Sequence, residues 1–145
     1  MPNEDTINLL KECNAGVKMA NKSFDEVIDR VKDLKMREQL EESRKKHQEI
    51  EKKTSSRLHE YGSEDKDPNK MATAMSWMKI NGKLAIEPTD SEIASLMIDG
   101  CNMGIQSISR YFNKYPTAEE EVKKMVDDIV KLEQKLMDEL RFYLR

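Results

Sequence analysis

The amino-acid sequence predicts an all-α protein, a four-helix bundle made of two pseudo-symmetric helical hairpins that a long helical crossover joins. Three observations lead to this prediction. Charged residues make up 37% of the 145 residues, with only five glycines and four prolines, a composition typical of long amphipathic helices. Apolar residues recur three or four positions apart over four long stretches. A short pattern also occurs twice, beginning at Cys13 and at Cys101, an offset of 88 (101 − 13).

Both copies of this pattern read Cys-Asn-x-Gly followed by a β-branched residue, with a phenylalanine eleven positions after the cysteine. The second and last long helices also align, with Ile50 matching Leu132 and Tyr61 matching Tyr143. An internal repeat of this kind predicts two related hairpins. The alternative is coincidence, because helical sequences resemble one another easily.

The first hairpin is predicted over residues 4–31 and 34–61. Asn3 and Asp33 are suitable N-caps for its two helices. The first helix has a continuous apolar stripe: Ile7, Leu10, Cys13, Val17, Ala20, Phe24, Ile28 and Val31. The stripe of the second helix is unusually polar for an inward face: Met36, Leu40, Ser43, His47, Ile50, Thr54, Leu58 and Tyr61. Gly62 is a natural end for this helix.

The crossover is predicted over residues 62–88, with a helix that begins at Pro68. A helix of about 18 residues spans roughly 27 Å, which is about the length of a bundle. Such a connection would return the chain to the other end, so the second and third long helices would run parallel. The alternative is a simple up-down array. Four residues of this segment form an apolar face that is either core, a partner surface or, through its methionines, a copper site: Met71, Met75, Trp77 and Met78.

The second hairpin has clear start signals. Thr89-Asp-Ser-Glu92 and Thr117-Ala-Glu-Glu120 both fit a capping box, and they predict helices that begin near residues 89 and 117. Pro116 separates the two helices. The expected inward residues of the last helix are Val122, Met125, Ile129, Leu132, Leu136, Leu140 and Tyr143.

These features together resemble the ferritin-like superfamily, and in particular its small bacterial members of unknown function. The resemblance rests on Asn14-Ala-Gly16 in the first helix, Trp77 in the crossover and Cys101-Asn-Met-Gly104 in the third long helix. It implies a bundle of two hairpins with one long crossover.

The resemblance also raises the expectation of a di-iron site, which takes a Glu from each of two helices and Glu-x-x-His from the other two. The sequence argues against a complete site. Arg44 stands three residues before His47, where a Glu is needed, and the last helix has no histidine. Glu12 is the candidate ligand of the first helix, but its repeat partner is Gly100.

His47 is predicted to be a buried, hydrogen-bonded core residue. The alternative is a ligand for iron, manganese or zinc, together with Glu51, Glu12 or Glu133. Cys13 and Cys101 are expected to be small buried residues, and a redox-responsive pair is the alternative.

Four further residues of the repeated pattern are predicted to form a helix contact. Gly16 and Gly104 would let two helices approach closely, and Asn14 and Asn102 would hydrogen-bond across the same contact.

Composition and charge exclude several classes of function. Acidic and basic residues are interspersed and the net charge is −3, so the sequence shows no basic cluster of the kind that binds nucleic acid. No apolar run reaches the length of a membrane span, and two cysteines make no disulfide framework. From the polar first residues we expect no signal peptide. We therefore expect a cytoplasmic, non-catalytic protein without a cofactor, which acts by association with itself, as a homodimer, or with a protein partner.

Overall fold

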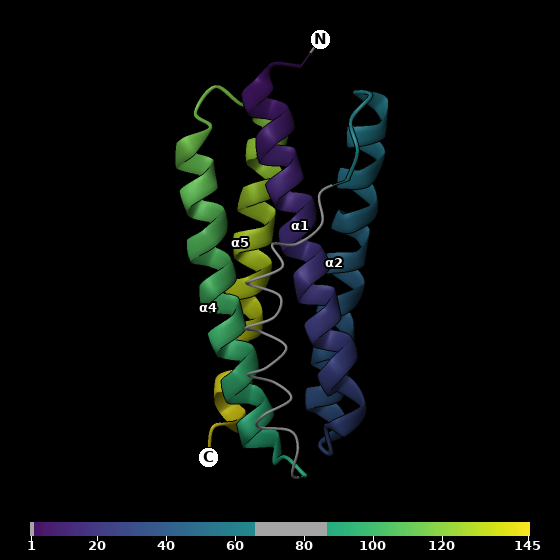
Figure 1. The fold of residues 1–145 in the computed structure, drawn as a ribbon. Helices are drawn as coiled ribbons and strands as arrows, with labels where there is room; N and C mark the ends of the chain where they lie inside the picture. Colours follow the sequence, from purple (N-terminus) through teal and green to yellow (C-terminus); the bar gives the residue numbers. More distant parts are fainter. Residues whose placement is uncertain (1, 66–86) are drawn as a thin grey trace.

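The computed structural model describes residues 2–65 and 87–145, and all the secondary structure in these ranges is helical. The long helices lie side by side as a four-helix bundle, which confirms the predicted all-α class (Figure 1). Their bounds are α1 Glu4–Val27, α2 Leu34–Glu60, α4 Asp90–Lys114 and α5 Glu120–Leu140, with short 3₁₀ turns η1 Ile28–Arg30 and η2 Arg141–Tyr143. The crossover helix predicted within 62–88 lies almost wholly outside the described residues.

Of the four predicted starts of the long helices, three are confirmed by their caps. Asn3 accepts a hydrogen bond from the backbone of Thr6, Asp33 accepts one from Met36, and Thr89 forms the expected capping box with Glu92. The fourth is wrong, because α5 begins at Glu120 and not directly after Thr117. The Thr117 hydroxyl donates to Asp5 Oδ2 at 2.6 Å. The N-cap of α5 is Glu119 instead, and its backbone N–H donates to Thr6 Oγ1 at 2.9 Å.

Two aspartates connect the hairpins through hydrogen bonds. Each aspartate lies at the start of one hairpin and accepts from the loop of the other. Asp90, the first residue of α4, accepts from the backbone N–H groups of Lys32 and Asp33, each at 2.9 Å. At the opposite end of the bundle, Asp5 of α1 accepts from the backbone N–H of Thr117 at 3.0 Å. These contacts place the start of α2 beside the start of α4, and the start of α1 beside the α4–α5 loop. Accordingly α2 runs parallel to α4, and α1 runs parallel to α5 (Figure 1).

The apolar core has two halves. The half near the α1–α2 loop contains Phe24, Val27, Met36, Leu40, Ile93, Leu136 and Leu140, and the half near the α4–α5 loop contains Leu9, Leu10, Val17, Leu58, Ile108, Val122 and Ile129. Between the two halves, α2 and α5 bury polar side chains: Ser43, His47 and Glu133. The centre of the bundle is therefore a polar layer.

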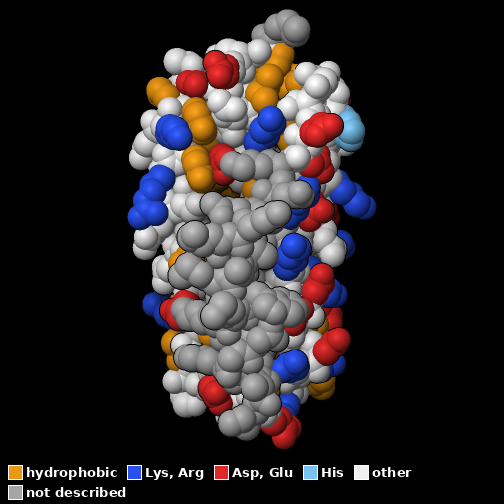
Figure 2. Space-filling model, viewed as in Figure 1, with side chains coloured by type: hydrophobic (Ala, Val, Ile, Leu, Met, Phe, Trp, Pro, Cys, Tyr) orange, Lys and Arg blue, Asp and Glu red, His pale blue; other side chains and the backbone are white. Residues whose placement is uncertain are grey.

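The surface carries no large region of one charge on the face shown in Figure 2. Acidic and basic side chains are interspersed over the described residues of this face, in agreement with the sequence pattern. Within residues 2–65 and 87–145, no helix is both long enough and apolar enough to cross a membrane.

The two copies of the Cys-Asn-x-Gly pattern have different surroundings. Both cysteines are buried, but Asn14 is fully buried whereas Asn102 is exposed. Because α1 turns its Cys13–Asn14 side inward, Gly16 lies about 200° beyond Asn14 and faces outward. A Cβ built on Gly16 meets no described atom within 4 Å. Gly16 therefore makes no close helix contact within the described residues, and the predicted hydrogen bond of Asn102 across it stays a prediction.

Candidate functional site: the polar layer

His47 of α2 and Glu133 of α5 meet in the middle of the bundle. The His47 side chain is completely buried and Glu133 is 7% exposed. His47 Nε2 hydrogen-bonds with Glu133 Oε1, and Nδ1 lies 2.8 Å from the backbone carbonyl oxygen of Ser43, one helical turn earlier. A carbonyl oxygen only accepts, so Nδ1 carries a hydrogen. Both nitrogens of the imidazole ring are thus engaged with protein groups.

This geometry leaves one proton between Nε2 and Oε1. The pair is either an imidazolium beside a carboxylate or a neutral imidazole beside a carboxylic acid, and both forms satisfy both groups. Either form avoids the large cost of a buried charge without a partner. Loss of one member, however, would leave the other without its partner in an apolar interior.

Two other helices contact the pair. The Cys101 thiol of α4 donates a hydrogen bond to Glu133; burial, the negative charge of Glu133 and this hydrogen bond all raise the pKa of Cys101. The Phe24 ring of α1 packs edge-on against His47, with 5.1 Å between ring centroids. On α4, a Cβ added to Gly104 would lie 3.7 Å from Glu133 Oε2. All four long helices therefore meet at the His47–Glu133 pair.

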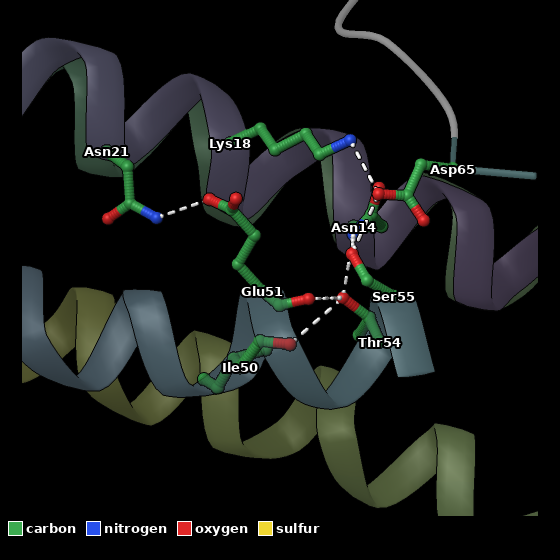
Figure 3. A network of polar contacts seen from close by, with 8 residues as sticks. All are labelled: Asn14, Lys18, Asn21, Ile50, Glu51, Thr54, Ser55 and Asp65. Atoms are coloured by element: carbon green, nitrogen blue, oxygen red, sulfur yellow. Dashed lines mark hydrogen bonds and ion pairs between the residues drawn. The ribbon is translucent and has the colours of Figure 1, made fainter. Parts of the chain in front are cut away.

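A second group of polar contacts joins α1 to α2 (Figure 3). Asn14 Nδ2 donates to Thr54 Oγ1 at 2.9 Å and to Ser55 Oγ at 3.0 Å. Two turns along α1, Asn21 Nδ2 donates to Glu51 Oε1 at 2.8 Å. The side-chain oxygens of Asn14 and Asn21 are buried and accept no hydrogen bond within the described structure. Asn14 therefore does contribute to a helix contact, but with α2.

Asp65, just beyond α2, closes the outer edge of these contacts. Its Oδ2 atom accepts from Ser55 at 2.8 Å and from Lys18 Nζ at 3.1 Å (Figure 3). Burial raises the pKa of Asp65, but the hydrogen bonds from Ser55 and Lys18 and the Lys18 charge outweigh burial and lower it overall. This contact is partly solvated, so its contribution to stability is small.

The structure brings together two of the four metal-ligand candidates, His47 and Glu133. Glu51 is hydrogen-bonded to Asn21, and Glu12 lies close enough to Cys13 for its charge to raise the pKa of that thiol. Among residues 2–65 and 87–145, no three side chains of His, Cys, Asp or Glu are grouped to hold a metal ion. These residues do not supply the ligand set of a di-iron centre.

The redox candidates lie in different halves of the core. Cys13 is in the cluster of Leu9 and Val17, Cys101 is in the cluster of Phe24 and Leu136, and both are free thiols. Burial, and secondarily the charge of Glu12, raises the pKa of Cys13 to about 12. A thiol reacts as its thiolate, and a raised pKa lowers the thiolate fraction, so both cysteines are expected to react slowly in redox chemistry. The partner-surface candidates Met71, Met75, Trp77 and Met78 lie outside the described residues.

The partner of His47 could have been found in the sequence. Glu133 lies four residues after Ile129 and three before Leu136, so it continues the apolar stripe of α5. The apolar pattern predicted Leu132 as the inward residue at this place, but Leu132 is only half-buried whereas Glu133 is buried. A lone glutamate on an apolar stripe is the signal of a buried polar partner.

The class of protein is thus an all-α four-helix bundle with a polar centre. A family model described as a domain of unknown function (DUF2383) matches residues 5–114, and because this is more than half of the chain, the protein belongs to that family. No curated protein and no solved structure matches the chain. The matched region includes His47 and Cys101, whereas Glu133 lies beyond it in α5.

Proposed function

We propose that the protein is a ferritin-like bundle of the cytoplasm without a complete di-iron site, and that it acts by association with itself or with a partner protein, not by catalysis. The observation that carries this proposal is the His47–Glu133 pair. It stands at the centre of the bundle, where a ferritin-like protein would hold metal, and both imidazole nitrogens are bound to protein groups. The polar centre is thus used for packing the four helices together.

The direction of the helices supports the ferritin-like part of the proposal. The contacts of Asp90 place the starts of α2 and α4 at the same end of the bundle, so the end of α2 and the start of α4 are at opposite ends. This is the geometry that a long crossover between two hairpins requires.

Exposed apolar side chains support association. At one end of the bundle, Leu34 is 75% exposed and Phe142 is 61% exposed, and on α4 Met103 is 52% exposed. Exposed apolar side chains that gather in one area mark contact surfaces more often than scattered ones do. These residues give the protein candidate surfaces for a partner.

The test combines metal analysis with a variant of the centre. The full chain, purified without a tag, would be analysed for iron, manganese and zinc, and the measurement would be repeated on His47→Gln. We expect less than about 0.1 metal ion per chain in both proteins. A stoichiometric metal ion in the wild type that is lost in the variant would overturn the non-catalytic proposal.

The alternative function is that of a degenerate metal-binding protein centred on His47. The convergence of His47 and Glu133 from opposite hairpins favours it, because imidazole and carboxylate are common ligands of iron, manganese and zinc. Metal would have to displace the proton that the pair shares. The metal analysis above decides between the two functions.

A further inference from the structure

Charged residues are unevenly distributed along α4. This helix packs against α1 and α5 through Ile93, Met97, Cys101 and Ile108. Its outward side chains include Asn102, Met103, Gln106 and Ser107, all of them exposed. No charged residue occurs between Gly100 and Ser109, although 37% of the whole chain is charged. The middle of the α4 outer face is thus uncharged, and Met103 lies in its centre.

The charges of α4 are separated by sign on either side of this uncharged stretch. The acidic residues Asp90, Glu92 and Asp99 precede it, and the basic residues Arg110 and Lys114 follow it. Glu92 and Lys114 each lie eleven residues from Met103, about three helical turns, and so all three share one face. Complementing the helix dipole explains the charges of the first and last turns, but Asp99 and Arg110 lie farther inside the helix.

We propose that this α4 face pairs with the same face of a second copy of the chain, with the two helices antiparallel about a two-fold axis at Met103. The inference rests on the proposed function of association and names its partner and its surface. An antiparallel pair places the acidic half of one helix against the basic half of the other, with Glu92 opposite Lys114 of the second copy. A parallel pair would bring like charges together.

The uncharged centre favours a second copy as the occupant. In a two-fold interface, residues near the axis face their own copies, so any charge there would be repelled by itself. The α4 face has the uncharged centre that this symmetry requires, and it has flanks of opposite sign. Met103 on one helix meets Met103 on the other, and two exposed apolar side chains are removed from water.

The first test is Met103→Glu, measured by sedimentation of the full chain over a range of concentrations. We expect the wild type to form a dimer, and the variant to raise its dissociation constant at least about tenfold, because two like charges would face each other at the axis. The matched control is Gln48→Glu, which adds the same charge at an exposed residue of α2, away from the α4 face. The control should leave the dissociation constant within about twofold of wild type.

The second test exchanges charges. Arg110→Glu and Asp99→Lys should each weaken the dimer, because each places like charges in the two facing halves. The double variant restores opposite charges across the axis and should recover most of the wild-type affinity. Thermal unfolding of each variant checks that the monomer fold is intact, which separates a loss of pairing from a loss of folding.

The outcomes separate this inference from the proposed function. If the wild type dimerises but Met103→Glu and the charge variants leave the dimer unchanged, the α4 face is not the interface, and association through another surface stands. If the wild type stays monomeric up to millimolar concentration, self-association is overturned. Metal bound through His47 would overturn the proposed function instead, without changing the sedimentation result.

Discussion

At the scale of single residues, the His47–Glu133 pair places two polar groups in the interior, and each depends on the other as a hydrogen-bond partner. Two titratable groups are buried in an interior that is otherwise mostly apolar, and they are held by one hydrogen bond to each other and further contacts with Ser43 and Cys101. Breaking a buried polar pair is costly, whereas replacing both members with apolar residues of similar size is often neutral.

Glu133→Ala should therefore lower the free energy of unfolding by about 3 kcal/mol, since it leaves His47 buried without its partner. Urea denaturation measures this. The double variant His47→Leu/Glu133→Met should recover most of the loss. A cost below about 1 kcal/mol for Glu133→Ala would show that the pair contributes little to stability.

Gly16→Ala should stabilise the protein by about 0.8 kcal/mol. Gly16 lies inside a helix, is exposed, and has no described atom within 4 Å of an added Cβ. Alanine is the better helix former at such a position, and it reduces the conformational freedom of the unfolded chain. The melting temperature of the variant checks this; a decrease would mean that Gly16 does serve as a close contact.

The buried thiols predict a loss of stability in alkali. The pKa of Cys13 is raised from 9.0 to about 12, so between these values the unfolded chain loses a proton that the folded protein keeps. The stability is fully present below pH 9 and is lost as the pH rises toward 12. Urea denaturation between pH 8 and pH 11 should show this decrease, and Cys13→Ala should show a shallower one. An equal slope in both proteins would exclude Cys13 as the cause.

At the scale of elements, sequence patterns predicted four long helices and most of their starts, because caps and apolar stripes are local signals. They did not predict that α5 begins late. The Thr117 side chain is compatible with a capping box when the local sequence is considered alone. In the fold, however, its hydroxyl donates to Asp5, which is distant in the sequence. Likewise, the repeated Asn-x-Gly predicted equal contacts in two helices, whereas the two helices turn different sides inward. Long-range contacts and helix rotation are not encoded in a local pattern.

The attachment of the α1–α2 loop to α4 is testable at this scale. Asp90→Ala removes the acceptor of two backbone hydrogen bonds, and it should cost about 1–2 kcal/mol. Hydrogen exchange at the amides of Lys32 and Asp33 should become faster. Glu87→Ala is the matched control: its ion pair with Lys32 is exposed at both ends and should contribute little. Equal effects of the two variants would rule out the hydrogen bonds as the source.

At the scale of the whole molecule, the sequence predicted a bundle of two hairpins, and the described helices form a four-helix bundle. The polar stripe of α2 indicated polar residues in the interior. His47 was expected to be a hydrogen-bonded core residue, and it is buried and hydrogen-bonded. Its partner was not identified, since the pairing of His47 with Glu133 spans 86 residues and depends on how α2 packs against α5. Thus the burial of His47 could be predicted from the sequence, whereas its pairing with Glu133 could not, because that pairing depends on helix packing.

The polar layer also fixes how far each helix can slide along its neighbours. A shift of α5 by one turn, about 5.4 Å, could carry Glu133 away from His47 and toward the apolar half around Met36 and Leu40 of α2. Apolar contacts alone tolerate such a shift, because one leucine can replace another. One polar layer between two apolar halves does not, so His47 and Glu133 set a single axial register for the bundle.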